Sequence, residues 1–236
     1  MKVLVVHAHP EPKSFSSALK DIAVEVFRED GHEVQVSDLY AMRFNPVASA
    51  DDFGQRANAD YCVYALEQRH GVANGTISTD IQDELEKLMQ CDLLVLNFPV
   101  FWFSTPAILK GWFDRVLVSG TVYGGTRFYD RGGLRGKRVI VSVTLGGQVH
   151  MFGNDGVHGP FEGMLKHLLQ GTLAYTGLDV LAPFVAWHVP YVTTEERLEV
   201  LKDWRERLSS LEHETPLAFP SLDDFDENLY PLGNTP

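Results

Sequence analysis

The stretch "VVHAHPEPKSFSSAL", residues 5 to 19, joins a short apolar run to a loop rich in proline and serine, and the loop leads into a helical pattern. The run begins earlier as "KVLVV" and is apolar on both faces, as a buried strand of a parallel sheet requires. Ser14 or Ser16 can cap the helix, apolar residues recur at helical spacing as far as Phe27, and Gly31 can end it. The stretch therefore predicts a strand, a loop and a helix in direct succession.

Four more apolar runs follow along the chain, separated by helical patterns such as residues 78 to 90: "HEVQVSDL", "DLLVLNF", "KRVIVSVTL" and "LDVLAPFVAW". Strands that alternate with helices predict a doubly wound α/β fold. We expect a five-stranded parallel sheet in the order 2-1-3-4-5, with helices on both faces and a C-terminal extension.

Two segments are longer than this sheet needs, residues 40 to 77 and residues 120 to 136. Loops of such length usually serve a function or face a partner. The segment from residue 215 onwards carries prolines and aromatics without a period, which predicts an arm laid over a surface. We therefore expect one domain over residues 1–211 and an extension over residues 212–236.

Composition narrows the class of protein. With 20 Lys+Arg against 32 Asp+Glu, the formal net charge is -12, so the surface would repel a polyanion and we expect no nucleic-acid partner. Cys62 and Cys91 form no CxxC pair, which argues against a disulfide framework and suits a reducing compartment. The run "DLLVLNFPVFWF" is far shorter than the roughly 18 to 20 residues that cross a bilayer. We expect a cytoplasmic protein without membrane insertion.

The loop after the first strand has the composition of a phosphate site. In an open parallel sheet, ligands bind beyond the carboxyl ends of the strands, near the point where the strand order reverses. The N-terminus of the following helix offers unpaired N–H groups, and one ammonium and three hydroxyls surround it: Lys13, Ser14, Ser16 and Ser17. A metal site at His7 and His9 is the less favoured interpretation of this loop. We interpret His9 as a loop anchor or a ligand contact, with packing as the alternative.

The loop after the third strand, within "FPVFWFSTPAILKGWFDRV", becomes more aromatic where a strand exit normally turns polar. We interpret Trp102 and Phe103 as the wall of a site for a flat apolar ligand. Trp112 and Phe113 stand at helical spacing from preceding apolar residues, and we expect them in the core.

The loop after the fourth strand, "TLGGQVHMFGNDGVHG", begins with two glycines. Without a Cβ, Gly146 and Gly147 let backbone N–H groups approach a ligand, although an ordinary turn would use the same residues. His158 stands in a glycine-rich loop that has too few bulky side chains to bury it. Together the three loops predict a planar aromatic cofactor with a phosphate tail. Flavin fits better than NAD, because the first loop lacks the G-x-G-x-x-G fingerprint.

The chain resembles the NAD(P)H:quinone oxidoreductase (DT-diaphorase) family, within the wider flavodoxin-like fold. The matching features are "AHPEPKSFS", "SDLYAMRFNP", "FPVFWFSTPAILKGWFDRV", "TLGGQVHMFGNDGVHG" and "ETPLAF". The resemblance implies two-electron reduction of quinones by NAD(P)H through FAD, in a ping-pong hydride transfer. It also implies a homodimer with the active site at the subunit interface, a catalytic domain over residues 1–211, and an extension over residues 212–236 that packs on the domain or on the dimer partner.

Functional residues carry over from the resemblance by position. The FAD would contact residues from all three loops and from a later segment: His9, Lys13, Ser14, Phe15, Ser16, Ala18, Pro99, Val100, Phe101, Trp102, Phe103, Thr144, Leu145, Gly146, Gly147, Phe152 and Arg197. Arg197 would reach the adenine end. Tyr123, Phe128 and Tyr175 would border the quinone pocket, partly from the other subunit, and His158 would be catalytic.

The chain departs from the family at several of these positions. Relatives place a glutamine, an asparagine and a threonine where this chain has Phe101, Ser16 and Leu145. The tyrosine that accompanies the catalytic histidine is replaced by Phe152, and a second pocket tyrosine is replaced by Gly125.

Two of the departures have chemical consequences. Because Phe152 cannot donate a hydrogen bond, His158 and the N–H groups of the glycine loop would have to stabilise developing negative charge alone. A metal site known from one branch of the family has no ligands here, so we expect no metal; the positions hold Gln170, Ala174 and Thr176.

Two alternative functions stay open on the sequence. One is an FMN-dependent azo- or nitroreductase, and the other is a flavodoxin-like electron carrier or regulatory subunit. A carrier would expose its flavin edge under a small acidic rim, whereas this chain has long loops and an aromatic pocket segment. The C-terminal extension and Arg197 favour FAD over FMN. The expected partners are a small quinone and a nicotinamide nucleotide.

Overall fold

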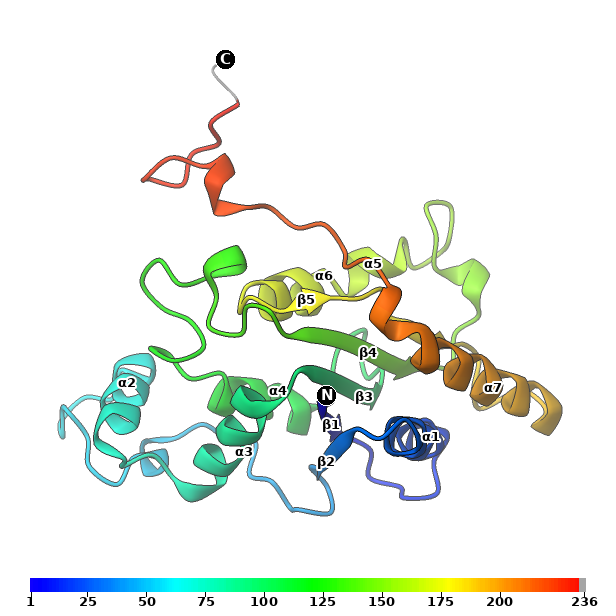
Figure 1. Ribbon diagram of the computed structural model, residues 1–236, viewed down its shortest axis with the longest axis horizontal. Coiled ribbons are helices and arrows are strands. Elements are labelled where there is room, and N and C mark those ends of the chain that lie inside the picture. Colours follow the sequence, from blue (N-terminus) through cyan, green and yellow to red (C-terminus); the bar gives the residue numbers. More distant parts are fainter. Residues whose placement is uncertain (234–236) are drawn as a thin grey trace.

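Strands and helices alternate along the chain in a computed structural model that describes residues 1–233 (Figure 1). The strands are β1 (Lys2–His7), β2 (Glu33–Asp38), β3 (Leu93–Pro99), β4 (Arg138–Thr144), β5 (Asp179–Val180) and β6 (Phe184–Ala186). The α-helices are α1 (Phe15–Glu29), α2 (Tyr64–Asn74), α3 (Thr79–Gln90), α4 (Ala107–Val116), α5 (Phe161–Met164), α6 (Lys166–Leu168) and α7 (Thr194–Ser210). A π-helical segment, Leu169–Ala174, continues α6.

Within the described residues, the strands form one parallel sheet in the order β2-β1-β3-β4-β5. This confirms the predicted strand order and the flavodoxin-like fold class. The predicted fifth strand is divided in two: β5 and β6 both pair with β4, Arg138 opposite Asp179 and Ser142 opposite Phe184. Pro183 lies between the two pieces, and proline has no N–H for a continuous ladder.

Two layers of helices cover the sheet. Val3 and Val5 pack with α1 and α7 on one face, and Leu4 and Val6 pack with α3, α4 and the segment 161–174 on the other, since side chains alternate along a strand. Figure 1 places α1 and α7 side by side, where the Trp204 Nε1–H donates to the backbone oxygen of Leu19 at 2.9 Å.

The core on the second face includes the predicted aromatics of α4. Trp112 is fully buried and Phe113 nearly so, which confirms that they belong to the core rather than to a ligand site. The aromatic residues of the loop before α4 can therefore be interpreted separately from the buried aromatic residues of the helix.

The excursion over residues 40 to 77 folds onto α4. It was expected to be a loop, and this is wrong for its second half, which forms α2. A buried ion pair anchors the excursion: Arg115 Nη2 lies 2.7 Å from Asp52 Oδ1, and the Tyr64 hydroxyl donates to Asp52 Oδ2 at 2.5 Å. The contact with α4 is very close, because a Cβ on Gly111 would lie 2.1 Å from the backbone oxygen of Pro46.

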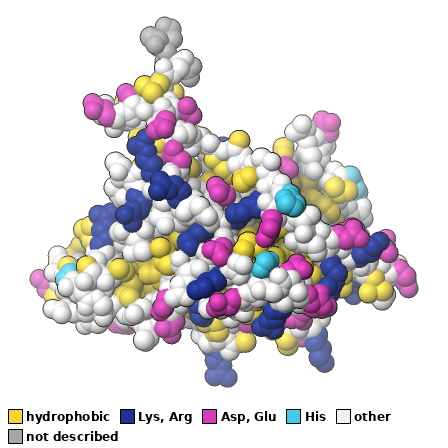
Figure 2. Space-filling view, in the orientation of Figure 1, with side chains coloured by type: hydrophobic (Ala, Val, Ile, Leu, Met, Phe, Trp, Pro, Cys, Tyr) yellow, Lys and Arg dark blue, Asp and Glu magenta, His cyan; other side chains and the backbone are white. Residues whose placement is uncertain are grey.

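The C-terminal extension crosses the edge of the sheet and then projects from the body (Figure 1). The backbone N–H of Leu217 donates to the Val180 oxygen at 2.8 Å, and Arg131 forms an ion pair with Asp223 at 2.6 Å. Figure 2 shows acidic side chains on the projecting arm and basic side chains at its base. The last three residues of the predicted extension, 234–236, lie outside the described residues.

Among the helices of residues 1–233, none combines the length and the apolar character that a bilayer span needs.

Candidate functional site

A cavity of about 330 Å³ lies at the carboxyl ends of β1, β3 and β4, where the three predicted loops meet. The loops supply His9, Ser14, Phe15, Ser16, Pro99, Val100, Phe101, Thr144, Leu145 and Gly146 to its lining. Each of these residues belongs to the predicted cofactor-binding set. The volume lies at the lower end of the range of about 300–1,000 Å³ that is typical of small-molecule sites. The structure thus brings distant parts of the chain together around one space.

The first wall of the cavity is the N-terminus of α1. Ser14 caps this helix, as predicted, and its Oγ accepts a hydrogen bond from the Ser17 N–H at 3.1 Å. His9 Nδ1 accepts from the Glu11 N–H at 3.0 Å, so the neutral ring carries its hydrogen on Nε2. Burial lowers the pKa of His9. This wall therefore presents hydrogen-bond donors and the positive end of a helix, which suit an anion.

Buried side chains tie the three loops together beneath the cavity. Ser16 Oγ lies 2.7 Å from Thr144 Oγ1 and joins α1 to β4. His7 Nδ1 lies 2.6 Å from Asn97 Oδ1 and joins β1 to β3, and the Asn97 amide nitrogen donates to Ser142 Oγ of β4 at 3.3 Å. These bonds fix the positions of the loops relative to one another.

The second wall contains a strained aromatic turn. Phe101 and Ser104 pair through both backbone N–H groups at 3.0 Å, with Trp102 and Phe103 between them at φ angles of 50° and 59°. Bulky residues in this left-handed region cost about 1–3 kcal/mol each. Trp102 is 96% exposed in the single chain. Strain and exposure together indicate a turn shaped for a ligand or a partner, rather than for the core.

The third wall is the glycine loop, with an aromatic cluster behind it. A Cβ on Gly147 would lie 2.7 Å from Cε2 of Phe152, so that ring closes over the glycine. The His158 ring contacts Phe152 and Phe103, at centroid distances of 5.0 and 5.1 Å. A Cβ on Gly146 would meet no atom nearer than 3.9 Å, so this part of the cavity wall is open.

Arg197, near the start of α7, lies behind the loop that follows β6. Its Nη2 donates to the backbone oxygen of Val189 at 3.1 Å, and Val189 itself lines the cavity. Its Nε is buried and finds no hydrogen-bond partner among the described residues. An unsatisfied buried donor costs about 1–3 kcal/mol. Arg197 contacts the cavity wall through Val189 and does not line the cavity itself.

The cavity also has a side that the sequence analysis missed. Val189 and Pro190 line it from the loop after β6. His188, at a φ of 55°, lies 2.8 Å through Nδ1 from the Gly146 oxygen. The same rule on strand ends could have indicated this loop, but Pro183 obscures where the last strand stops.

The predicted quinone-pocket residues lie elsewhere in the single chain. Tyr123, Phe128 and Tyr175 contact one another, with Phe128 and Tyr175 stacked at 5.6 Å. The segments that carry them lead into the amino ends of β4 and β5. None of the three lines the cavity near His9.

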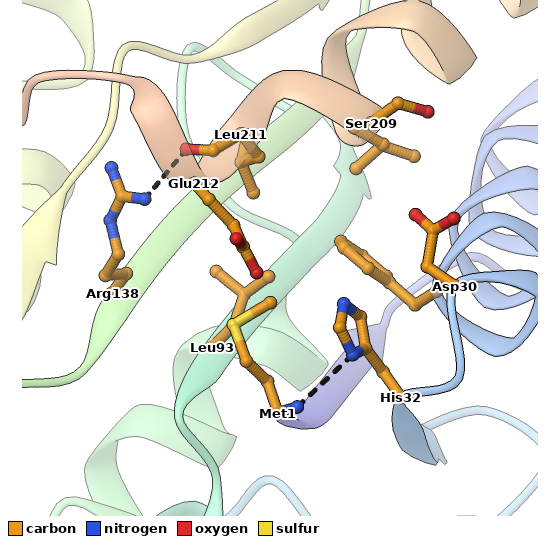
Figure 3. Close-up of a pocket in the computed structure, with 10 residues that line it drawn as sticks. Met1, Asp30, His32, Leu93, Arg138, Ser209, Leu211 and Glu212 are labelled. Atoms are coloured by element: carbon orange, nitrogen blue, oxygen red, sulfur yellow. Dashed lines mark hydrogen bonds between the residues drawn. The ribbon is translucent and has the colours of Figure 1, made fainter.

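A second cavity, of about 320 Å³, lies at the amino ends of β3 and β4, so the two cavities lie at opposite ends of these strands (Figure 3). The first residues of β3 and β4, Leu93 and Arg138, line it together with Met1. Two of its polar groups pair locally: the Met1 amino group lies 3.2 Å from His32 Nδ1, and Arg138 donates to the Leu211 oxygen at 2.7 Å. The amino ends of strands are not where open parallel sheets bind ligands, so we assign the function to the first cavity.

The fold and the first cavity define a flavodoxin-like α/β protein with a site suited to a nucleotide cofactor. The chain matches the family model of the flavodoxin-like fold over residues 1–208. It is 43% identical to ribosyldihydronicotinamide dehydrogenase (quinone) from Mus musculus, over 92% of this chain and 94% of the relative. It is 39% identical to NAD(P)H dehydrogenase (quinone) 1 from Rattus norvegicus, over 97% of this chain and 84% of the relative.

A solved structure agrees with these relatives. A candidate quinone reductase from Klebsiella pneumoniae has a TM-score of 0.94 and 37% identity, and the match covers 98% of this chain and 94% of the other. The chain belongs to the NAD(P)H:quinone oxidoreductase family of flavin-dependent enzymes, as its sequence motifs indicated.

Proposed function

We propose that this protein reduces quinones by two electrons, taken from NAD(P)H, through FAD bound in the cavity at the carboxyl ends of β1, β3 and β4. The observation that carries the proposal is the meeting of three loops around one cavity, in a chain whose relatives are quinone dehydrogenases. When bound, the flavin would accept a hydride from the nicotinamide and pass it to the quinone in a ping-pong scheme.

The residues of this chain would bind and orient the reactants. Ser14, the His9 Nε2–H and the first N–H groups of α1 suit the phosphate groups. Trp102 and Phe103 would lie against the flat face of the ring, with the backbone of Gly146 along its edge. Holding reactants in a fixed orientation lowers the barrier without any group of the protein reacting covalently.

The choice of FAD over FMN rests on Arg197. Its Nε is buried without a partner among the described residues, and we propose that a cofactor longer than FMN reaches this arginine. The adenosine part of FAD provides acceptors beyond the phosphates.

Two features support a homodimer with the active site at the interface. Trp102, beside the cavity, is 96% exposed in one chain, and such a surface usually meets a partner. The cluster of Tyr123, Phe128 and Tyr175 lies away from the cavity of its own chain. A second copy would have to bring it to the quinone, as the family resemblance implies.

His158 is the proposed catalytic residue. It lies against Phe103 and Phe152, and Phe152 offers no hydrogen bond. In its protonated form, His158 would stabilise negative charge that develops at the edge of the ring.

The proposal also covers the division of the chain into domains and the cellular compartment of the protein. Residues 1–211 would form the catalytic domain, and the extension over residues 212–236 would lie on that domain or on the partner. Cys62 and Cys91 are both free thiols, which agrees with a reducing compartment such as the cytoplasm.

The test is to purify the protein, record its visible spectrum, identify the released flavin, and assay menadione reduction. The names of the relatives include two reductants, so NADH, NADPH and ribosyldihydronicotinamide are assayed separately. We expect bound FAD and turnover with at least one of the nicotinamides. FMN in its place would favour the azo- or nitroreductase alternative, and a colourless protein that gains no activity with added FAD would refute the proposal.

A further inference from the structure

The turn over residues 119–128 carries two arginines to which the proposed function gives no part. It lies between α4 and β4, and it includes Tyr123 and Phe128 of the proposed quinone pocket. Arg69 reaches the turn from α2, Arg127 belongs to the turn itself, and both side chains are exposed. Aromatic rings and guanidinium groups thus meet in one short stretch of chain.

Arg69 lies directly against the turn. Its Nε donates to Ser119 Oγ at 2.9 Å. A Cβ on Gly120 would lie 2.9 Å from Cγ of Arg69, and a Cβ on Gly124 would lie 2.9 Å from its Nη2. Both glycines have positive φ angles, of 92° and 127°, which glycine adopts at little cost. The turn therefore needs glycine at both positions for Arg69 to lie so close.

Arg127 is bound to the same turn. Its backbone pairs with that of Gly124 through two hydrogen bonds of 3.1 Å. Its Nη1 donates to the backbone oxygens of Gly120 and Thr121 at 3.2 and 2.9 Å. The two guanidinium groups thus contact the same stretch of backbone. A guanidinium that is already held in place loses less side-chain entropy when it binds an anion.

Neither of these arginines is neutralised by a carboxylate of residues 1–233. The arginines that form ion pairs there are Arg115, Arg131, Arg205 and Arg207. A guanidinium has five N–H donors, and in this part of the chain the side chain of Arg69 uses only Nε and that of Arg127 only Nη1. In a chain with a net charge of -12, two unpaired guanidinium groups on one turn favour an anionic ligand.

The rings beside the arginines indicate the chemistry of that anion. Phe128 and Tyr175 are stacked at 5.6 Å, and Tyr123 lies 6.0 Å from Tyr175. Aromatic rings suit a flat base, and guanidinium groups bind phosphate oxygens through two parallel hydrogen bonds. The relatives are named for two kinds of reductant, NAD(P)H and ribosyldihydronicotinamide. The dinucleotides carry phosphate groups, whereas ribosyldihydronicotinamide carries none.

We propose that Arg69 and Arg127 bind phosphate groups of the nicotinamide dinucleotide, and that this chain therefore uses NADH or NADPH in preference to ribosyldihydronicotinamide. The inference rests on the proposed function, because the turn is away from the cavity of its own chain and would serve the cavity of a second copy. The arginines bind the reductant and take no part in the transfer of the hydride.

The test is the steady-state kinetics of menadione reduction by FAD-loaded protein with NADPH, NADH and ribosyldihydronicotinamide. In the double variant Arg69→Gln and Arg127→Gln, kcat/KM is expected to fall about tenfold for NADPH and about threefold for NADH, because NADPH carries one more phosphate. For ribosyldihydronicotinamide it is expected to stay within about twofold. The loss with the dinucleotides is expected in KM rather than in kcat, since the contact is the same before and during hydride transfer.

Arg131→Gln is the matched control. It removes another exposed arginine of the same segment, but the guanidinium of Arg131 is already paired with Asp223 at 2.6 Å. We expect kcat/KM to stay within about twofold for all three reductants. A loss with NADPH as large as that of the double variant would show an effect of net charge rather than of the two guanidinium groups, and would overturn the proposal.

The dependence on salt is a second measurement that a purely structural role would not change. Between about 50 and 500 mM NaCl, kcat/KM of wild-type protein for NADPH is expected to fall more steeply than that for ribosyldihydronicotinamide, because salt screens exposed charges. The double variant should show a shallower fall with NADPH. A slope that the double variant leaves unchanged would overturn the proposal.

The remaining outcomes separate this proposal from the proposed function. An equal loss with all three reductants would mean that the arginines only hold the turn in place, and would overturn the proposal. Wild-type protein that uses ribosyldihydronicotinamide better than either dinucleotide would overturn it too. Both results leave quinone reduction intact. Wild-type protein that reduces no quinone with any of the three reductants would overturn the proposed function as well.

Discussion

His158 lies against two phenylalanine rings, and we propose that it stabilises the negative charge that develops on the flavin. Its ring centroid is 5.1 Å from that of Phe103 and 5.0 Å from that of Phe152. We predict that His158→Ala slows reduction of the bound flavin by NAD(P)H at least tenfold, which corresponds to about 1.4 kcal/mol of barrier. Single-turnover absorbance measurements check this. An unchanged rate would remove His158 from catalysis.

Phe152→Tyr is the complementary change. The ring keeps its size and its contacts with His158 and Trp187, and gains a hydroxyl that can donate. We expect the same single-turnover rate or a faster one. A large loss of rate would mean that the loop carries a different part of the mechanism.

The two glycines of the third loop provide a matched pair. Ala at position 146 would meet no protein atom nearer than 3.9 Å, so Gly146→Ala should keep the melting temperature and weaken FAD binding about tenfold by narrowing the cavity. Ala at position 147 would press on Phe152, 2.7 Å away. Gly147→Ala should therefore lower the free energy of unfolding by about 1–3 kcal/mol. Equal effects of both variants on melting and on binding would contradict this account.

The same residues indicate how far a sequence can predict a site. The loop residues around the cavity were foreseen because strand ends and motif positions agree. Val189 and Pro190 were missed, since Pro183 divides the last strand and obscures where it ends. The network of His7 was missed as well, because it depends on which side chains meet across three strands.

At the scale of elements, the buried ion pair between Arg115 and Asp52 holds the excursion to α4 at 2.7 Å. Arg115→Met would leave the Asp52 carboxylate buried without its cation, and we expect a loss of about 3–5 kcal/mol in the free energy of unfolding. Urea denaturation measures it. Arg205→Met is the control, because the ion pairs of Arg205 with Glu25 and Glu29 are exposed and should contribute little. Similar midpoints for the two variants would contradict the assigned role.

The helix α2 escaped the sequence analysis for a physical reason. Its buried positions are Glu67, Gln68 and Gly71 rather than apolar residues, so no apolar stripe marks it. Tertiary hydrogen bonds replace that stripe: Glu67 accepts from the backbone N–H groups of Ala57 and Asn58, and Gln68 accepts from the Ser119 N–H. The helices α1 and α3 were predicted because their inward faces are apolar.

At the scale of the molecule, the sheet order was predictable because the strands are long apolar runs separated by helices. The homodimer with its active site at the interface follows from the family resemblance and stays a prediction, since a single chain shows only half of such an interface. The exposed Trp102 and the distant cluster around Tyr175 are the two halves that a dimer would join.

The central claim is that the cavity at the carboxyl ends of β1, β3 and β4 binds the flavin. The most direct test is a crystal structure of the protein prepared with FAD. This account predicts density for the ring against Trp102 and Gly146, phosphates at Ser14, and the adenine end near Arg197. Density in the opposite cavity, beside Met1 and Arg138, or none in either cavity, would contradict it.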